Sequence, residues 1–215
     1  MSNPILSSYR LGDLVILSNL TEYEKEKLCL EHPNSFGDEY IKLNLPNTIF
    51  TNKIENKIKN ITSIVSNFIN NNDLFPSDIE DSIVIHIRLG DVLAGLNNCE
   101  TSKRPLDIDF LQSIIDSIKE PYKNIYIIGK SHYGSSSFDI DKYDECKLLS
   151  DKYLNDCLAR FNAIHFNSNN PDIDLCCAIK SKLFIQGKGN YSKLILEIRK
   201  YLNLNSIETN YDIYY

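Results

Sequence analysis

The stretch "IVIHIRLGDVLAG", residues 83–95, decides the fold class that this sequence predicts. It begins with a run of β-branched residues, which predicts a strand over 82–88 that is covered on both faces of a parallel sheet. Side chains of a strand alternate between its faces, so His86 and Arg88 share one face near the carboxyl end of this strand. Ligands bind at that end of open α/β sheets. The alternative explanation is a structural ion pair between Arg88 and Asp91 across a turn at Gly90.

Strand-like and helix-like segments alternate after this stretch. Further strands are expected at 124–129, 163–166 and 183–186. Helices are expected to begin at Asp107, at Ser150, at Asn170-Pro171 and at 191. Repeated strand–helix units of this kind predict an α/β fold with a doubly wound parallel sheet.

The segment upstream of the sheet predicts how the chain is divided. Residues 53–70 carry isoleucine, valine and phenylalanine at helical spacing, which predicts an amphipathic helix. The polar, proline-containing stretch "NNNDLFPSD", residues 70–78, follows it and is the expected boundary between two lobes. The sequence thus predicts a reduced N-terminal lobe over 1–78 and a Rossmann-like lobe over 79–215.

The composition argues against several classes of protein. The chain has 215 residues and a formal net charge of −6, whereas a general nucleic-acid binder would carry a basic face. No stretch approaches the roughly 20 apolar residues of a membrane span, and the first residues lack the pattern of a signal peptide. The cysteines contain no CxxC pair, which favours free thiols over a zinc site; they are Cys29, Cys99, Cys146, Cys157, Cys176 and Cys177. We therefore expect a cytoplasmic protein without nucleic-acid binding or membrane insertion.

A second functional signal is the loop "GKGNYS", residues 187–192, which links a predicted strand to the last predicted helix. Its two glycines allow the backbone to approach a ligand closely. The amides that open the following helix, together with the positive end of the helix dipole, form an anion site. A plain glycine turn is the alternative explanation. The candidate binding residues of this loop are Gly187, Gly189, Asn190, Tyr191 and Ser192.

The two signals together suggest a family. Arg88 offers a planar fork to a phosphate, so a diphosphate that bridges Arg88 and the 187–192 loop is the simplest joint hypothesis. The motif "HIRLGD", residues 86–91, resembles the HxRxGD motif of the fucosyltransferase superfamily with the GT-B fold, which includes α-1,2-fucosyltransferases. The later "PDIDLCCAIKSK" and "GKGNYS" fit the order of that superfamily's motifs, and the resemblance covers residues 80–202. The loop departs from the "NSTFSWW" of α-1,2-fucosyltransferases, and "IYIIGK" lacks the Ser-Asp-Asp that often follows the matching strand.

This resemblance implies a GT-B-like glycosyltransferase with a GDP-sugar donor, fucose being one candidate sugar, and a glycan or other hydroxyl acceptor. It places Arg88 on the diphosphate and Ser192 on a phosphate oxygen. His86 would hydrogen-bond the donor, the alternative being a histidine whose hydrogen bonds are satisfied within the sheet. Asp174 or Asp172 would lie near the nucleoside, although acids in a first helical turn also complement the helix dipole. No DxD-type motif adjoins these residues, so we expect transfer without a bound metal or another cofactor.

Two aspartates are candidates for the chemistry itself. Asp13, in the N-terminal "RLGDLV", is a candidate general base for the acceptor hydroxyl. The alternative explanation is a turn at Gly12 with a local ion pair. Asp91 is expected to orient Arg88 rather than to act as a base. Two other functions stay open at this point. One is a non-catalytic module that binds a nucleotide or phosphosugar, and the other is a phosphate-ester hydrolase with the same anion site.

Overall fold

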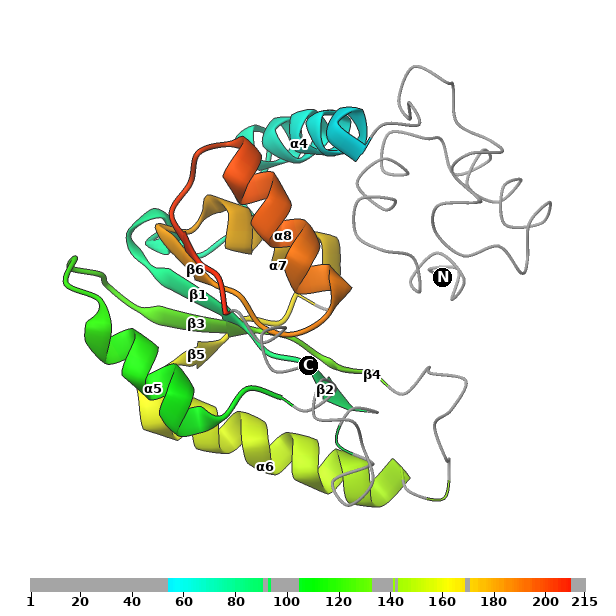
Figure 1. Ribbon diagram of the computed structural model, residues 1–215, viewed down its shortest axis with the longest axis vertical. Helices are drawn as coiled ribbons and strands as arrows, with labels where there is room; N and C mark the ends of the chain where they lie inside the picture. Colours follow the sequence, from blue (N-terminus) through cyan, green and yellow to red (C-terminus); the bar gives the residue numbers. More distant parts are fainter. Residues whose placement is uncertain are drawn as a thin grey trace.

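The computed structural model of the protein describes residues 54–90, 93, 105–132, 141, 143–168 and 171–209. These residues form an α/β fold around a five-stranded sheet in which all neighbouring strands are parallel (Figure 1). In the order in which they lie side by side, the strands are β5 (Ile164–His165), β3 (Ile125–Ile128), β1 (Ile83–His86), β6 (Leu183–Ile185) and β7 (Ser206–Ile207).

The strand order contains a topological switch point. From β1 the chain moves outward through β3 to β5, then crosses to the other side of β1 and continues through β6 to β7. Hence β1 and β6 are neighbours, but the chain leaves β1 toward the β5 edge of the sheet and leaves β6 toward the β7 edge. A Rossmann-like sheet has this order, and its ligands bind outside the carboxyl ends of the strands at the switch point. The predicted α/β fold with a doubly wound parallel sheet is confirmed.

Helices cover both faces of this sheet (Figure 1). One face is covered by α5 (Ile108–Ser117) and α6 (Tyr143–Phe161). The other face is covered by α4 (Ile54–Asn70), α7 (Pro171–Lys180) and α8 (Asn190–Tyr201). The short 3-10 helix η2 (Ile79–Asp81) precedes β1. Beyond the carboxyl ends of β1 and β3, β2 (Leu89–Gly90) pairs in parallel with β4 (Ser131–His132).

Each central strand divides its side chains between two hydrophobic cores. Val84 and Phe184 pack with α4, α7 and α8, whereas Ile83, Ile85 and Ile127 pack with α5 and α6. All four residues of β1 are buried, because helices lie on both faces of the strand. Burial on both faces explains the continuous hydrophobic run at the start of the stretch 83–95.

Several predicted helix boundaries agree with the structure and one is wrong. Asp107 is the N-cap of α5, and its carboxylate accepts a hydrogen bond from the backbone N–H of Phe110 at 3.0 Å. Ser150, however, does not open a helix, because α6 already begins at Tyr143. The Ser150 hydroxyl donates a hydrogen bond of 2.7 Å to the carbonyl oxygen of Cys146, one turn earlier in the same helix. The hydroxyl therefore has its acceptor inside α6 and does not cap a helix end. The same oxygen accepts the N–H of Gly90 at 3.0 Å and thereby fixes α6 to β2.

Two strands also differ from the prediction. The strand expected over 82–88 is interrupted, since β1 ends at His86 and β2 begins at Leu89. The edge strand β7 is absent from the prediction, because two half-buried residues after an asparagine-rich turn give no periodic signal.

Arg199 of α8 links the end of α7 to the segment that leads into the edge strand β7. Its side chain is fully buried, and Nη1 donates to the carbonyl oxygens of Ala178, Ile179 and Ser181 at 2.6–3.0 Å. Nη2 donates to the carbonyl oxygen of Asn205 at 2.6 Å. Burial lowers the pKa of this guanidinium to about 10, so it is still charged at neutral pH and complements the carboxyl end of α7.

Asp78 joins the amino ends of β1 and β3. Its carboxylate accepts hydrogen bonds from Asn124 Nδ2 at 2.6 Å, Tyr126 Oη at 2.7 Å and Ser82 Oγ at 3.0 Å. These bonds, that of Asn124 foremost, lower the pKa of Asp78 from 3.8 to about 2. The residue that the sequence analysis places at a lobe boundary is therefore bonded to the sheet.

The helix α4 confirms the amphipathic helix predicted over 53–70. It packs against α7 and α8, and Val65 is fully buried in their core. Residues 1–53 lie outside the described residues, and the predicted lobe boundary at 78 stays a prediction.

The described part of the chain has no disulfide bond and no helix that could span a membrane. None of its helices combines the length and the apolar character needed to cross a bilayer. Four cysteines are described and all are free and buried; they are Cys146, Cys157, Cys176 and Cys177. Cys29 and Cys99 lie outside the described residues.

Candidate functional site

The two sequence signals meet at the switch point between β1 and β6. His86 ends β1, Arg88 follows two residues later, and the 187–192 loop follows β6. A Cβ atom added to Gly187 would overlap the carbonyl oxygen of His86 and lie 2.6 Å from its Nδ1. A Cβ atom added to Gly189 would lie 3.1 Å from Arg88 Nη1. At both glycines, therefore, the backbone of the loop packs directly against the residues at and just after the end of β1.

The first turn of α8 faces this junction. Gly189 is the N-cap with φ +95°, a value that L residues rarely adopt, and no side chain caps the helix there. Ser192 is fully buried, and its oxygen accepts the backbone N–H of Gly187 at 2.8 Å. The Ser192 hydroxyl thus closes the loop on itself, a role that the sequence analysis does not include. Asn190 opens α8, and its side chain lies outside the described part.

His86 is buried between the loop and α8. Its ring centroid lies 5.1 Å from that of Tyr191, and only 6% of the residue is exposed. Burial, and secondarily the charge of Arg88, lowers the pKa of His86 to about 3. The imidazole is therefore neutral at physiological pH and adds no positive charge to the site. Within the described part of the chain, its Nδ1 is buried without a hydrogen-bond partner.

Arg88 lies in the two-residue break between β1 and β2. The N–H of Ile87 still donates to the carbonyl oxygen of Ile128 at 2.9 Å, and pairing resumes at Leu89. The backbone on both sides of Arg88 is thus held to the neighbouring strand, while its side chain is exposed. Such a placement presents a guanidinium to solvent at a fixed point of the sheet edge.

Asp174 lies near the carboxyl ends of the strands, in the first turns of α7, which follows β5 in the sequence. It is 7% exposed and accepts hydrogen bonds from the backbone N–H of Ser168 at 3.0 Å and from Ser168 Oγ at 2.6 Å. Burial raises the pKa of Asp174, and the two bonds from Ser168 and the charges of His165 and Lys130 oppose that rise. Its neighbour Asp172 lies in the first turn of α7, with a side chain outside the described part.

Two predicted residues cannot be placed. Asp13 and Asp91 both lie outside the described residues, so the geometry of a general base and of the Asp91–Arg88 pair stays open. The described ranges contain no group of three or more His, Cys, Asp or Glu side chains suited to hold a metal ion.

Gln186 is a site residue that the sequence analysis overlooks. Ile85 of β1 pairs with Ile185 of β6, so Gln186 falls beside His86 and on the same face of the sheet. It is 5% exposed, and its Oε1, like the Nδ1 of His86, is buried without a partner among the described residues. A recognisable signal was present, since the hydrophobic runs of both strands end in a polar residue, "IVIH" and "LFIQ".

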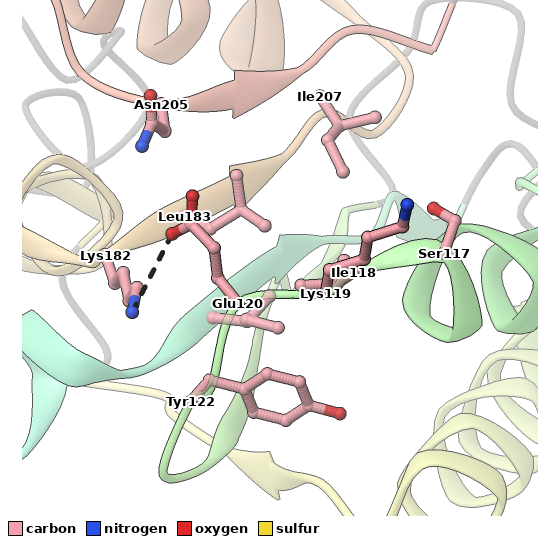
Figure 2. A pocket seen from close by; sticks show the side chains of 10 residues that line it. Ser117, Ile118, Lys119, Glu120, Tyr122, Lys182, Leu183, Asn205 and Ile207 are labelled. Carbon is pink, nitrogen blue, oxygen red and sulfur yellow. Dashed lines mark ion pairs between the residues drawn. The ribbon is translucent and has the colours of Figure 1, made fainter.

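A separate cleft of about 340 Å³ lies beside the first residues of β1 and β6, away from this site (Figure 2). Its apolar part is formed by Ile83, Leu183 and Ile207. Lys182 at its rim donates to the carbonyl oxygen of Pro121 at 2.8 Å and lies 3.8 Å from the carboxylate of Glu120. Parallel sheets bind ligands at the opposite edge, so the candidate site is the switch point and not this cleft.

Comparisons with models of protein families, with curated proteins and with solved structures return no match for this chain. Any function must therefore be argued from the geometry of the switch point and from the motif resemblance alone.

Proposed function

We propose that this chain is a metal-independent glycosyltransferase with a GT-B-like architecture, which transfers a sugar from a nucleoside diphosphate to a hydroxyl acceptor. The observation that carries the proposal is the meeting of Arg88 with the amino end of α8 at the switch point of a doubly wound sheet. That combination of a guanidinium and helix-opening amides suits a diphosphate. GDP is the favoured nucleotide and fucose one candidate sugar, because "HIRLGD" resembles the fucosyltransferase motif.

Two buried polar atoms support a ligand at this position. His86 and Gln186 are neighbours in register at the strand ends, and His86 Nδ1 and Gln186 Oε1 are both buried without a partner among the described residues. Unpaired buried polar atoms are costly, so they commonly mark a missing water or ligand. Both groups are neutral, since the pKa of His86 is lowered to about 3. They suit an uncharged polar part of the donor better than they suit a phosphate.

The proposed reaction uses these groups as follows. The acceptor oxygen bonds to the anomeric carbon, the bond from that carbon to the phosphate oxygen breaks, and the nucleoside diphosphate leaves with the electron pair. The acceptor proton passes to a general base, for which Asp13 is the candidate. Arg88 and the amides at the start of α8 stabilise the charge that grows on the leaving diphosphate. His86 and Gln186 orient the donor.

The test combines binding and turnover. Thermal unfolding of the full chain is followed with a panel of nucleotide sugars and free nucleotides, with and without EDTA, and donor consumption is measured with glycan acceptors. We expect stabilisation by GDP-sugars that EDTA leaves unchanged, and release of GDP that depends on the acceptor. Stabilisation without consumption would instead support the non-catalytic binding module, and release of inorganic phosphate would support the hydrolase. A chain that no nucleotide stabilises would contradict the proposal.

A further inference from the structure

Arg88 has a cationic neighbour in the segment that links β3 to β4. His86 pairs with Ile128 before the break in the strand, and Leu89 pairs with Ser131 after it. The register is the same on both sides of the break, so Arg88 falls opposite Lys130. Arg88 and Lys130 both lie in the short breaks between these strands, where the common register aligns them at the sheet edge. Both side chains are exposed, and both follow a strand at its carboxyl end.

A third cation completes this row on the other side of Arg88. Lys188 lies between Gly187, which packs on the carbonyl group of His86, and Gly189, which packs on the side chain of Arg88. Lys188 therefore stands at the level of Arg88 along the sheet. We call Lys130, Arg88 and Lys188 the cationic row. It crosses the ends of β3, β1 and β6, and so spans the switch point.

The cationic row contrasts with the rest of the molecule. The whole chain carries a formal net charge of −6, yet three of its cations follow neighbouring strands at one sheet edge. A polyanion bound at this edge would be attracted by all three charges. The row also adjoins the amino end of α8, whose dipole attracts anions. His86 and Gln186, with their unpartnered buried atoms, lie directly before the row on β1 and β6.

Lys130 also interacts electrostatically with a carboxylate at the same edge of the sheet. Its charge acts on Asp174, which is buried at the start of α7 and bonded to Ser168. Lys130 is thus aligned with Arg88 by the register and acts electrostatically on Asp174, the residue that the motif resemblance places near the nucleoside.

We propose that Lys130 is a further phosphate-binding residue, which together with Arg88 and Lys188 holds both phosphate groups of a nucleoside diphosphate. The inference rests on the proposed function for the identity of the ligand, and it names the residue that extends the anion site from β1 to β3. A single phosphate would be met by Arg88 and α8 alone. A diphosphate would also reach Lys130, so the site should prefer diphosphates to monophosphates.

The experiment measures the affinity of the full chain for GDP, GMP and inorganic pyrophosphate by titration calorimetry at several salt concentrations. Lys130→Gln should weaken GDP and pyrophosphate binding on the order of tenfold, as expected for loss of one hydrogen bond to a charged group, and affect GMP less. It should also reduce the salt dependence of GDP binding, while Lys130→Arg retains most affinity. Lys119→Gln, an exposed lysine at the opposite cleft, is the matched control and should bind as the wild type does.

The outcomes separate this inference from the proposed function. Equal affinity of Lys130→Gln and wild type for GDP and pyrophosphate would overturn the role of Lys130, even if GDP-sugars are consumed. Loss of GDP affinity in Lys130→Gln without any donor consumption by the wild type would support the inference and contradict the transferase. If the wild type binds none of the three probes, both proposals fail. The melting temperatures of all variants are measured as a control for folding. The charge reversal Lys130→Glu should remove GDP binding altogether.

Discussion

At the scale of single residues, two arginines of this chain have opposite surroundings. Arg199 is fully buried, and its guanidinium is saturated by carbonyl oxygens of α7 and of the segment before β7. Arg88 is exposed at the carboxyl edge, next to a glycine loop and a helix start. The first arrangement fixes the packing of elements, whereas the second places a guanidinium where a ligand of the proposed site could reach it. The same side chain can therefore be assigned to stability or to binding by the partners that surround it.

Arg88→Lys tests whether the guanidinium fork matters for transfer. We expect the variant to fold with an unchanged melting temperature, because the Arg88 side chain is exposed. Turnover of a donor that the wild type uses should fall on the order of 10²-fold, as when one donor to a developing negative charge is removed. Lysine keeps the charge but cannot form a bidentate pair. Near-normal turnover in this variant would mean that "HIRLGD", residues 86–91, is a structural turn, and the transferase proposal would lose its main support.

Asp78→Asn tests the network at the opposite edge through its pH dependence. The pKa of Asp78 is lowered from 3.8 to about 2, so its stabilising effect is complete above about pH 4 and is lost as the pH falls through 2. The melting temperature of the variant should therefore be lower than that of the wild type at neutral pH. The difference should shrink between pH 4 and pH 2. Asp73→Asn, an exposed carboxylate in the same segment, is the control; a difference that stays constant down to pH 2 would contradict the assignment.

At the scale of elements, the sequence predicts those segments whose signals are local. The β-branched run of β1, the Asp107 cap of α5 and the glycine loop before α8 each carry their structure in adjacent residues. The start of α6 is missed because a serine inside a helix can bond to the preceding turn, which a cap pattern cannot distinguish from a helix start. β7 is missed because its pairing with β6, and not its composition, makes it a strand.

Gly187→Ala tests the contact between the β6 loop and the end of β1. The added Cβ would overlap the backbone carbonyl oxygen of His86, and a rotamer change cannot relieve a backbone contact. We expect a loss of stability of about 1–3 kcal/mol, as for other overpacked sites, and weaker binding of GDP because the loop moves away from Arg88. Urea unfolding and calorimetry measure the two effects. Glu197→Ala, on the exposed side of α8, should change neither, and an unperturbed Gly187→Ala would show that the loop is not packed as described.

At the scale of the whole molecule, the candidate site depends on information that no single segment contains. His86 and Arg88 are visible in one strand and the glycine loop in another, but their adjacency follows from the order of the strands. Gln186 and Lys130 become site residues only once the register aligns them with His86 and Arg88. Patterns within the sequence therefore gave candidate residues, and the topology decided which of them share one edge.

The predicted lobe boundary at residue 78 can be tested by cutting the chain there. Val65 of α4 is fully buried against α7 and α8, and complete burial of such a side chain contributes about 1.5–3 kcal/mol. A fragment of residues 79–215 loses that cover and also loses Asp78 with its bonds to β3. We expect the fragment 54–215 to melt at the highest temperature, 71–215 at a lower one because it keeps Asp78 but not α4, and 79–215 at the lowest. Equal melting temperatures for 54–215 and 79–215 would mean that α4 belongs to a separate lobe, whereas the expected order would make α4 part of the same domain as the sheet.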